Sequence, residues 1–168
     1  MTCETTSALC TEREQNTPRR ILFVCTGNTC RSPMAAALLN DMAARTECTG
    51  ELLAASAGLF AADGEPITPA ASRALQRADI PSTPQNNYME HRAATITAEH
   101  VAQADLVVGL TRSHAMQLLL RFPESAGKIT CFPMDIQDPF GGSDEIYSQC
   151  LLDLRAAVCE MFFDGGTP

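Results

Sequence analysis

The apolar residues of this chain gather into short runs that alternate with longer segments of mixed character. Residues 21–24 (Ile-Leu-Phe-Val) form a continuous apolar run, which is typical of a strand buried on both faces of a parallel sheet. Similar runs predict further strands over residues 52–56, 106–110 and 128–132. The chain is therefore expected to contain four short strands.

Helices are predicted between these strands. Ser32 and Pro33 begin one that the Ala-, Leu- and Met-rich residues 34–44 continue, because proline is well tolerated at an early helical position. Further helices are expected to start at hydroxyl side chains that act as N-caps, at Thr68, Thr97, Thr111 and Ser143. Strands that alternate with helices indicate an α/β fold with a parallel sheet in one layered domain.

Composition narrows the class of protein. The 168 residues suit one domain that buries a core without disulfides or metals. A net charge of -8 argues against a nucleic-acid partner, because affinity for nucleic acids comes mostly from Lys and Arg. Eight cysteines without a C-x2-C pair argue against a structural zinc site, so no metal is expected.

The N-terminal residues differ from the rest of the chain. Residues 1–19 are polar and mixed in charge, which predicts a flexible extension before a domain over residues 20–168. They hold no apolar run of secretory-signal length, and no stretch of the chain reaches the roughly 18 apolar residues that span a membrane. We therefore expect a cytoplasmic protein with reduced thiols and no membrane partner.

The first predicted strand leads into a loop with Cys-x5-Arg spacing, from Cys25 to Arg31. In a chain rich in both residue types this spacing alone is weak evidence, but its context is informative. The loop lies between a buried strand and a helix N-terminus, and its Gly27 and Asn28 tolerate left-handed backbone angles. Successive backbone N–H groups can then face inward and bind an anion, together with the positive end of the helix.

These surroundings suit a nucleophilic sulfur. A helix N-terminus and a nearby guanidinium both favour the thiolate form of a cysteine, so Cys25 is expected to attack phosphate. Arg31 would bind two phosphate oxygens with its planar fork of donors, and Ser32 could donate its hydroxyl to the sulfur. In the alternative interpretation Cys25 is a buried thiol at a strand end and Arg31 is a surface charge.

Residues 24–35, VCTGNTCRSPMA, resemble the signature of the low-molecular-weight protein tyrosine phosphatases and the related bacterial protein-arginine phosphatases. The resemblance runs from about residue 20 to the last helix and includes Ser56-Ala57-Gly58, His91-Arg92-Ala93, Ala104-Asp105 and Asp138-Pro139-Phe140. It implies a flavodoxin-like three-layer fold with a four-stranded parallel sheet flanked by helices. It also implies a phosphocysteine on Cys25, phosphorylated proteins as partners, inorganic phosphate as product and no cofactor.

The resemblance also implies roles for residues beyond Cys25. Asp138 would be the acid in the first step and the base in the second, although an Asp-Pro pair alone is a common turn element, and Asp135 and Asp144 are nearby alternatives. Asn28 would brace the loop, and His91 would either support it or be an ordinary structural histidine. The remaining expected substrate-binding residues are Thr26, Gly27, Asn28, Thr29, Cys30, Ser32 and Phe140.

Two features bear on the substrate. Tyrosine-directed members of the family usually have a larger branched residue at the position of Thr29 and Tyr side chains after the Asp-Pro pair. This chain has Thr29 and the segment Pro139-Phe140-Gly141-Gly142-Ser143, which resemble the arginine-directed members. Phosphoarginine in proteins is therefore the favoured substrate, with phosphotyrosine as the alternative. Thr29 could also be a small loop residue without a selective role.

Two other functions share this loop. Thioredoxin-coupled arsenate reductases need two further cysteines, and this chain has none between Cys48 and Cys131. A non-catalytic phosphoprotein-binding module would need neither a thiolate nor an acid, whereas Cys25, Arg31 and Asp138 are all present.

Cys30 suggests a mode of regulation. A thiol close to a reactive thiolate can protect it from overoxidation, so we hypothesise a reversible Cys25–Cys30 disulfide that switches the enzyme off. In the alternative interpretation Cys30 is an inert buried thiol.

Overall fold

The computed structural model of the chain describes residues 17–46 and 51–163. The predicted N-terminal extension falls mostly on residues 1–16, which lie outside the described part. The first strand begins at Arg19, one residue before the predicted domain boundary.

Four parallel strands form the sheet in the order β2-β1-β3-β4. They are β1 (Arg19–Cys25), β2 (Leu52–Gly58), β3 (Leu106–Gly109) and β4 (Ile129–Cys131). Val24 of β1 pairs with Ala57 of β2 and with Gly109 of β3, so β1 lies inside the sheet. The predicted four-stranded parallel sheet is confirmed.

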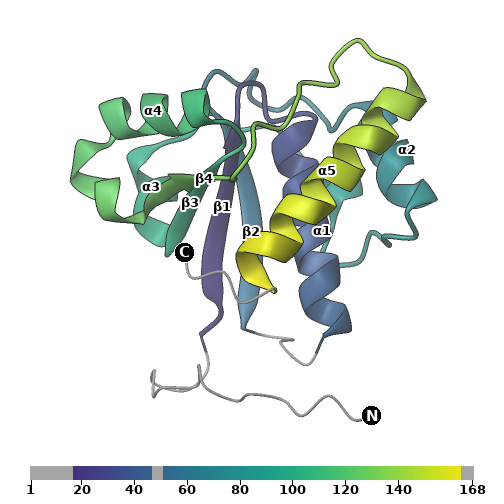
Figure 1. The fold of residues 1–168 in the computed structure, drawn as a ribbon, viewed down its shortest axis with the longest axis horizontal. Coiled ribbons are helices and arrows are strands. Elements are labelled where there is room, and N and C mark those ends of the chain that lie inside the picture. The colour runs from purple at the N-terminus through teal and green to yellow at the C-terminus, as the bar shows by residue number, and fades with distance from the viewer. Residues whose placement is uncertain (1–16, 47–50, 164–168) are drawn as a thin grey trace.

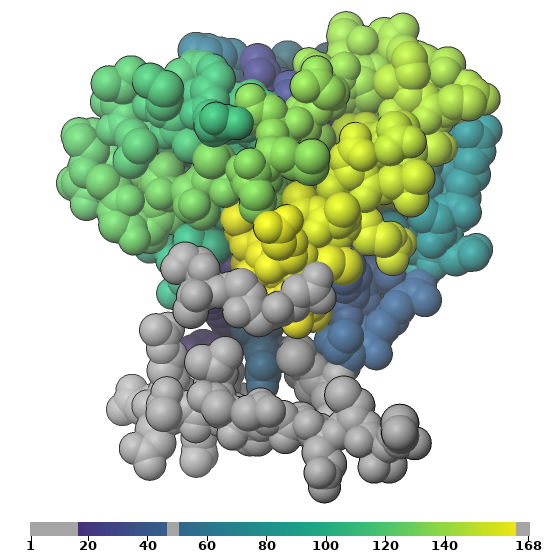
Figure 2. Space-filling view, viewed as in Figure 1, coloured from purple at the N-terminus to yellow at the C-terminus, as the bar shows by residue number. Residues whose placement is uncertain are grey.

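Helices cover both faces of the sheet, which gives the predicted three layers (Figure 1). One face carries α1 (Arg31–Arg45), α2 (Pro69–Arg77) and α5 (Asp144–Phe162), and the other carries α3 (Ala98–Gln103) and α4 (Arg112–Arg121). Two short 3-10 helices, Tyr88–Glu90 and Pro123–Lys128, lie in the connections. In the space-filling view α5 (yellow) and the green segment that includes α4 form neighbouring parts of one side (Figure 2).

The residues of β1 divide between two cores. Ile21 and Phe23 pack on the side of α1 and α5, whereas Leu22 and Val24 pack on the side of α3 and α4. All four are buried, which explains the continuous apolar run. Because β2 lies on one side of β1 and β3 on the other, the strand order reverses at β1. Folds of this kind bind ligands at the carboxyl ends of the strands beside such a reversal.

Three of the four predicted side-chain caps are confirmed. The side chains of Thr68, Thr97 and Thr111 each accept a backbone N–H from the first turn of their helix. Ser143 occupies the predicted N-cap position of α5, but its side chain forms no capping bond. A hydrogen bond from its hydroxyl to the carboxyl group of Glu145 instead lowers the pKa of that group.

Candidate active site

The loop that follows β1 surrounds the sulfur of Cys25 with hydrogen-bonding groups. Cys25 is buried, and its Sγ lies 3.0 Å from Oγ of Ser32. The backbone N–H of Asn28 donates to the same sulfur over 3.3 Å, from a residue with a left-handed φ of 56°. Because α1 begins at Arg31, the positive end of its dipole also points to this loop. These groups can all stabilise a thiolate.

The side chain of Asn28 holds the loop in this conformation. Its Nδ2 donates to the hydroxyl oxygens of Ser32 and Ser56, each over 2.9 Å. Its Oδ1 accepts the backbone N–H of Ala94 over 2.9 Å. One fully buried amide thus joins the loop to α1, to β2 and to the segment before α3.

His91 also contacts Asn28, as the prediction of a supporting role allows. Its Nε2 lies 2.7 Å from the backbone oxygen of Asn28, and a carbonyl oxygen only accepts, so Nε2 carries the proton. Burial lowers the pKa of His91, the bond to Asn28 opposes this effect, and the charge of Arg92 adds to it. The ring contacts the back of the loop and does not line the pocket.

Arg31 and Asp138 form an ion pair at the mouth of the loop. Nη2 of the buried Arg31 donates to Oδ2 of Asp138 over 3.1 Å, and its Nη1 donates to the carbonyl oxygen of Ile136 over 3.2 Å. The other carboxylate oxygen of Asp138 accepts the N–H of Phe140 over 3.2 Å. The long loop after β4 is thereby joined to the guanidinium, and it brings a partly exposed carboxyl group to the site.

These residues enclose a cavity of ≈ 190 Å³. It is lined by Cys25, Thr26, Gly27, Asn28, Thr29, Cys30, Arg31, Asp138 and Phe140. The structure therefore brings together all the predicted site residues except Ser32 and His91, which lie behind the loop. Asp135 and Asp144 pair with arginines elsewhere. Phe140, which is 73% exposed, is the one aromatic residue among those lining the cavity.

Cys30 lies in a small polar environment of its own. Its Sγ is 3.3 Å from the hydroxyl oxygen of Tyr147 and 3.4 Å from Oγ1 of Thr68. Burial, with the bond to Cys30, raises the pKa of Tyr147 to about 12, so its hydroxyl stays protonated and can donate to sulfur. Cys25 and Cys30 are free thiols, and the disulfide between them stays a prediction.

Two residues that contact the loop were not predicted from the sequence. His114 of α4 lies 3.0 Å from Oγ1 of Thr26 through its Nε2, and Tyr147 contacts Cys30. Tyr147 lies on the buried, mostly apolar face of α5, and the sequence pattern therefore predicts a core residue at this position. The one available signal for His114 was its place three residues after the N-cap Thr111, a spacing that brings a side chain back toward the cap.

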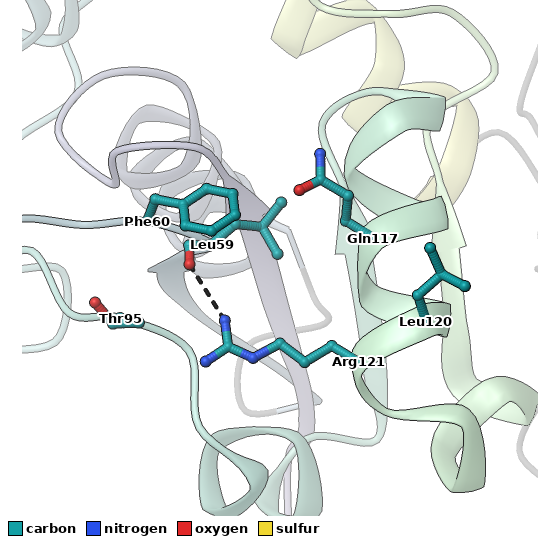
Figure 3. A pocket seen from close by; sticks show the side chains of 6 residues that line it. All are labelled: Leu59, Phe60, Thr95, Gln117, Leu120 and Arg121. Atoms are coloured by element: carbon teal, nitrogen blue, oxygen red, sulfur yellow. Dashed lines mark hydrogen bonds between the residues drawn. The ribbon is translucent and has the colours of Figure 1, made fainter.

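A larger hollow of ≈ 610 Å³ lies between α4 and the segment after β2 (Figure 3). It is lined by Leu59, Phe60, Thr95, Gln117, Leu120 and Arg121. Nη1 of Arg121 crosses it and donates to the carbonyl oxygen of Leu59 over 3.2 Å. The N–H of Leu59 in turn donates to the carbonyl oxygen of Cys25 over 2.9 Å. The hollow is therefore linked through Leu59 to Cys25, at the start of the loop that follows β1.

Residues 17–46 and 51–163 contain no group of three or more His, Cys, Asp or Glu side chains that could hold a metal ion. Over the same residues, no helix has both the length and the apolar character needed to cross a membrane. The groups available to bind an anion in the cavity are the loop amides, the N-terminus of α1 and Arg31.

A doubly wound α/β sheet whose first strand ends in a Cys-x5-Arg anion loop fits the class of cysteine-dependent phosphatases. The model of the family described as low molecular weight phosphotyrosine protein phosphatase matches residues 20–164, and the chain belongs to this family.

The relatives include enzymes named for two substrates. The protein-arginine-phosphatase of Geobacillus stearothermophilus is 40% identical over 148 residues, which cover 84% of this chain and 92% of the relative. A low molecular weight protein-tyrosine-phosphatase of Staphylococcus haemolyticus is 33% identical, over 77% of this chain and 88% of the relative. The solved low molecular weight protein tyrosine phosphatase of T. tengcongensis is 32% identical with a TM-score of 0.74, over 85% and 97% of the two chains. These similarities support a protein phosphatase with the predicted flavodoxin-like fold.

Proposed function

We propose that the chain removes phosphoryl groups from arginine side chains of proteins through a covalent intermediate on Cys25. The observation that carries the proposal is the environment of this sulfur. It is buried at the end of β1, with a hydroxyl and a backbone N–H at 3.0 and 3.3 Å, in a cavity that Arg31 and Asp138 also line. A thiolate beside an anion site is the arrangement that nucleophilic catalysis on a phosphoryl group requires.

In the first step the thiolate of Cys25 attacks phosphorus. The S–P bond forms while the bond from phosphorus to the guanidine nitrogen breaks, and Asp138 gives its proton to the leaving nitrogen. Arg31 and the loop N–H groups bind the phosphoryl oxygens and stabilise the charge that they carry in the transition state. The 3.1 Å contact between Arg31 and Asp138 supports the placement of this carboxyl group, because it keeps Asp138 next to the group that binds the phosphoryl oxygens.

In the second step a water molecule attacks the phosphocysteine. Asp138, now a carboxylate, takes a proton from the water as the new O–P bond forms and the S–P bond breaks. Inorganic phosphate leaves, and Cys25 returns to its thiolate form. Ser32, whose Oγ lies 3.0 Å from the sulfur, donates its hydroxyl to the thiolate of Cys25 as the S–P bond breaks.

Two observations favour phosphoarginine. Thr29 lines the cavity, where its hydroxyl oxygen can accept an N–H from a guanidinium group. The relative with the higher identity of the two described above is named a protein-arginine-phosphatase. Phosphotyrosine is the second candidate, and the exposed ring of Phe140 at the cavity favours it, because a phenyl ring could stack there.

Two peptides that differ only in carrying phosphoarginine or phosphotyrosine decide between these substrates. We expect a higher kcat/KM for the phosphoarginine peptide and no turnover of either peptide by Cys25→Ala. A higher kcat/KM for phosphotyrosine would overturn the assignment of the substrate. Full activity of Cys25→Ala would overturn the proposed chemistry.

Substitutions at Thr29 test its part in selectivity. Thr29→Ile should move the ratio of the two kcat/KM values toward phosphotyrosine, because it removes the hydroxyl and adds apolar bulk. Thr29→Ser, which keeps the hydroxyl, is the matched control and should preserve the ratio. Equal ratios in Thr29→Ile and the native enzyme would show that Thr29 does not select the substrate.

We infer that the enzyme works in the cytosol, since its chemistry needs a reduced sulfur. The five cysteines within the described part of the chain are free thiols, which supports this view. The Cys25–Cys30 disulfide would require Cys30 to leave its contacts with Tyr147 and Thr68. If the switch operates, peroxide inactivation should be reversed by reductant in the native enzyme and not in Cys30→Ser. Equal, permanent loss in both would exclude it.

A further inference from the structure

His114 connects the phosphate loop to α4 through both nitrogens of its ring. Its Nε2 lies 3.0 Å from Oγ1 of Thr26, a loop residue that lines the cavity. Its Nδ1 lies 3.0 Å from Oγ1 of Thr111, the N-cap of α4. The side chains of Thr26 and Thr111 are thus joined by one imidazole on a residue that is only 5% exposed.

This imidazole is neutral near pH 7. Burial lowers the pKa of His114 to about 4, and the positive charge of Arg31 adds to this effect. The negative charges of Asp138 and Asp135 oppose it only in part. A neutral ring has one N–H and one acceptor nitrogen, so it donates a hydrogen bond to one threonine hydroxyl and accepts one from the other.

The hydrogen bonds at Thr111 are compatible with a ring proton on Nε2. Oγ1 of Thr111 already accepts the backbone N–H of His114 over 3.2 Å, and its own hydroxyl proton can be donated to Nδ1. Nε2 then carries the ring proton and donates it to Oγ1 of Thr26. The hydroxyl proton of Thr26 is left free to point into the cavity.

We propose that His114 is a positioning residue, which orients the hydroxyl of Thr26 as a hydrogen-bond donor to the bound phosphoryl group. The inference rests on the proposed function and adds a donor to the loop amides and Arg31. A hydroxyl held in one orientation loses less freedom when the anion binds than one that rotates. It also stabilises charge on a phosphoryl oxygen without reorganisation.

A purely structural role for His114, holding α4 against the loop, needs a separate control. Arg121 provides it, because it also lies on α4 and donates to the carbonyl oxygen of Leu59 (Figure 3). Arg121→Met removes this second connection and keeps most of the apolar stem. It leaves the Thr26 hydroxyl untouched, so it reports the effect of loosening the helix alone.

The test compares His114→Asn, His114→Gln, Thr26→Val and the double variant His114→Asn/Thr26→Val. A Gln amide extends to about the place of Nε2 and can donate to Thr26, whereas an Asn amide extends only to the place of Nδ1. Two quantities are measured for each variant, kcat/KM on a chromogenic phosphate ester and the dissociation constant of inorganic phosphate. Thermal unfolding is followed as well, so that every assay is run well below the midpoint of that variant.

We expect Thr26→Val to lower kcat/KM by about tenfold, the effect of one hydrogen bond to a charged group. His114→Asn should lower it by a smaller factor, because the Thr26 hydroxyl loses its orientation but can still donate. The double variant should be no worse than Thr26→Val, because His114 has nothing to orient once the Thr26 hydroxyl is absent. His114→Gln should recover most of the loss, and Arg121→Met should keep native kcat/KM. The affinity of each variant for inorganic phosphate should fall in parallel with its kcat/KM.

Losses that multiply in the double variant, equal losses in the Gln and Asn variants, or a matching loss in Arg121→Met would each overturn the proposal. Failure of the proposed chemistry at Cys25 would look different, because the native enzyme would then not hydrolyse the ester. The phosphate dissociation constants would still report on His114 in that case, since they require binding and no chemistry.

Discussion

The substitution Asn28→Ala tests how the loop is held. It removes three side-chain hydrogen bonds, two donated by Nδ2 to Ser32 and Ser56 and one accepted by Oδ1 from Ala94. At roughly 1 kcal/mol each, these contribute about 3 kcal/mol to stability. Alanine at a φ of 56° adds about 1 kcal/mol of backbone strain. We therefore expect the free energy of unfolding to fall by about 4 kcal/mol.

The matched control is Asn28→Gly, which loses the same hydrogen bonds and tolerates the positive φ. It should cost about 1 kcal/mol less than Asn28→Ala. Equilibrium unfolding in urea measures both values, and kcat/KM shows whether the turn that directs the N–H toward Cys25 persists. A cost below about 1 kcal/mol for Asn28→Ala would refute the reasoning, since that is a typical loss for any substitution. Equal costs for the two variants would refute the part that concerns strain.

Three further predictions follow from the site. In Gly58→Ala the new Cβ would lie 2.7 Å from the carbonyl oxygen of Thr26, so kcat/KM and the unfolding midpoint should both fall. The control Gly127→Ala, which adds a Cβ in open space, should change neither quantity. Asp138→Asn should lower kcat by a factor of about 10² to 10⁴ and remove the limb of the pH–rate profile in which the rate falls as the acid loses its proton. An unchanged profile would exclude Asp138 as the acid. The pKa of His114 falls from 6.5 to about 4 on folding, so the unfolded chain binds a proton at a higher pH than the folded chain. The free energy of unfolding should therefore decline as pH falls from 6.5 to 4, and it should decline less steeply in His114→Gln. A slope identical in the two proteins would contradict the neutral ring.

The fold was predictable because its signals are local. The apolar run in β1 is continuous since both faces of this strand are covered, and the three threonine caps accept bonds from the turn that follows them. Ser143 was correctly predicted as the N-cap of α5, but its side chain accepts no backbone N–H, and its hydroxyl instead donates to the carboxyl group of Glu145. Sequence pattern identifies a residue that can form a cap, but whether its side chain accepts a backbone N–H depends on its rotamer in the folded helix.

The residues of the site likewise include some that could be predicted from the sequence and others that could not. The loop from Cys25 to Arg31 is continuous in sequence, so its chemistry could be inferred from spacing and context. Asp138 could be assigned only through a resemblance, because its distance from Arg31 depends on the path of a long loop. The contact of His114 with Thr26 spans 88 residues and that of Tyr147 with Cys30 spans 117. Such contacts depend on how α4 and α5 pack against the sheet, which periodicity does not report.

The most direct test of the account is to trap the covalent intermediate. The enzyme is mixed with a phosphoarginine peptide, stopped within one turnover by rapid denaturation, digested and analysed by mass spectrometry. We predict a phosphoryl group on the sulfur of Cys25 during turnover, and neither this adduct nor turnover in Cys25→Ala. Steady release of phosphate with an unmodified Cys25, and the same release by Cys25→Ala, would contradict it.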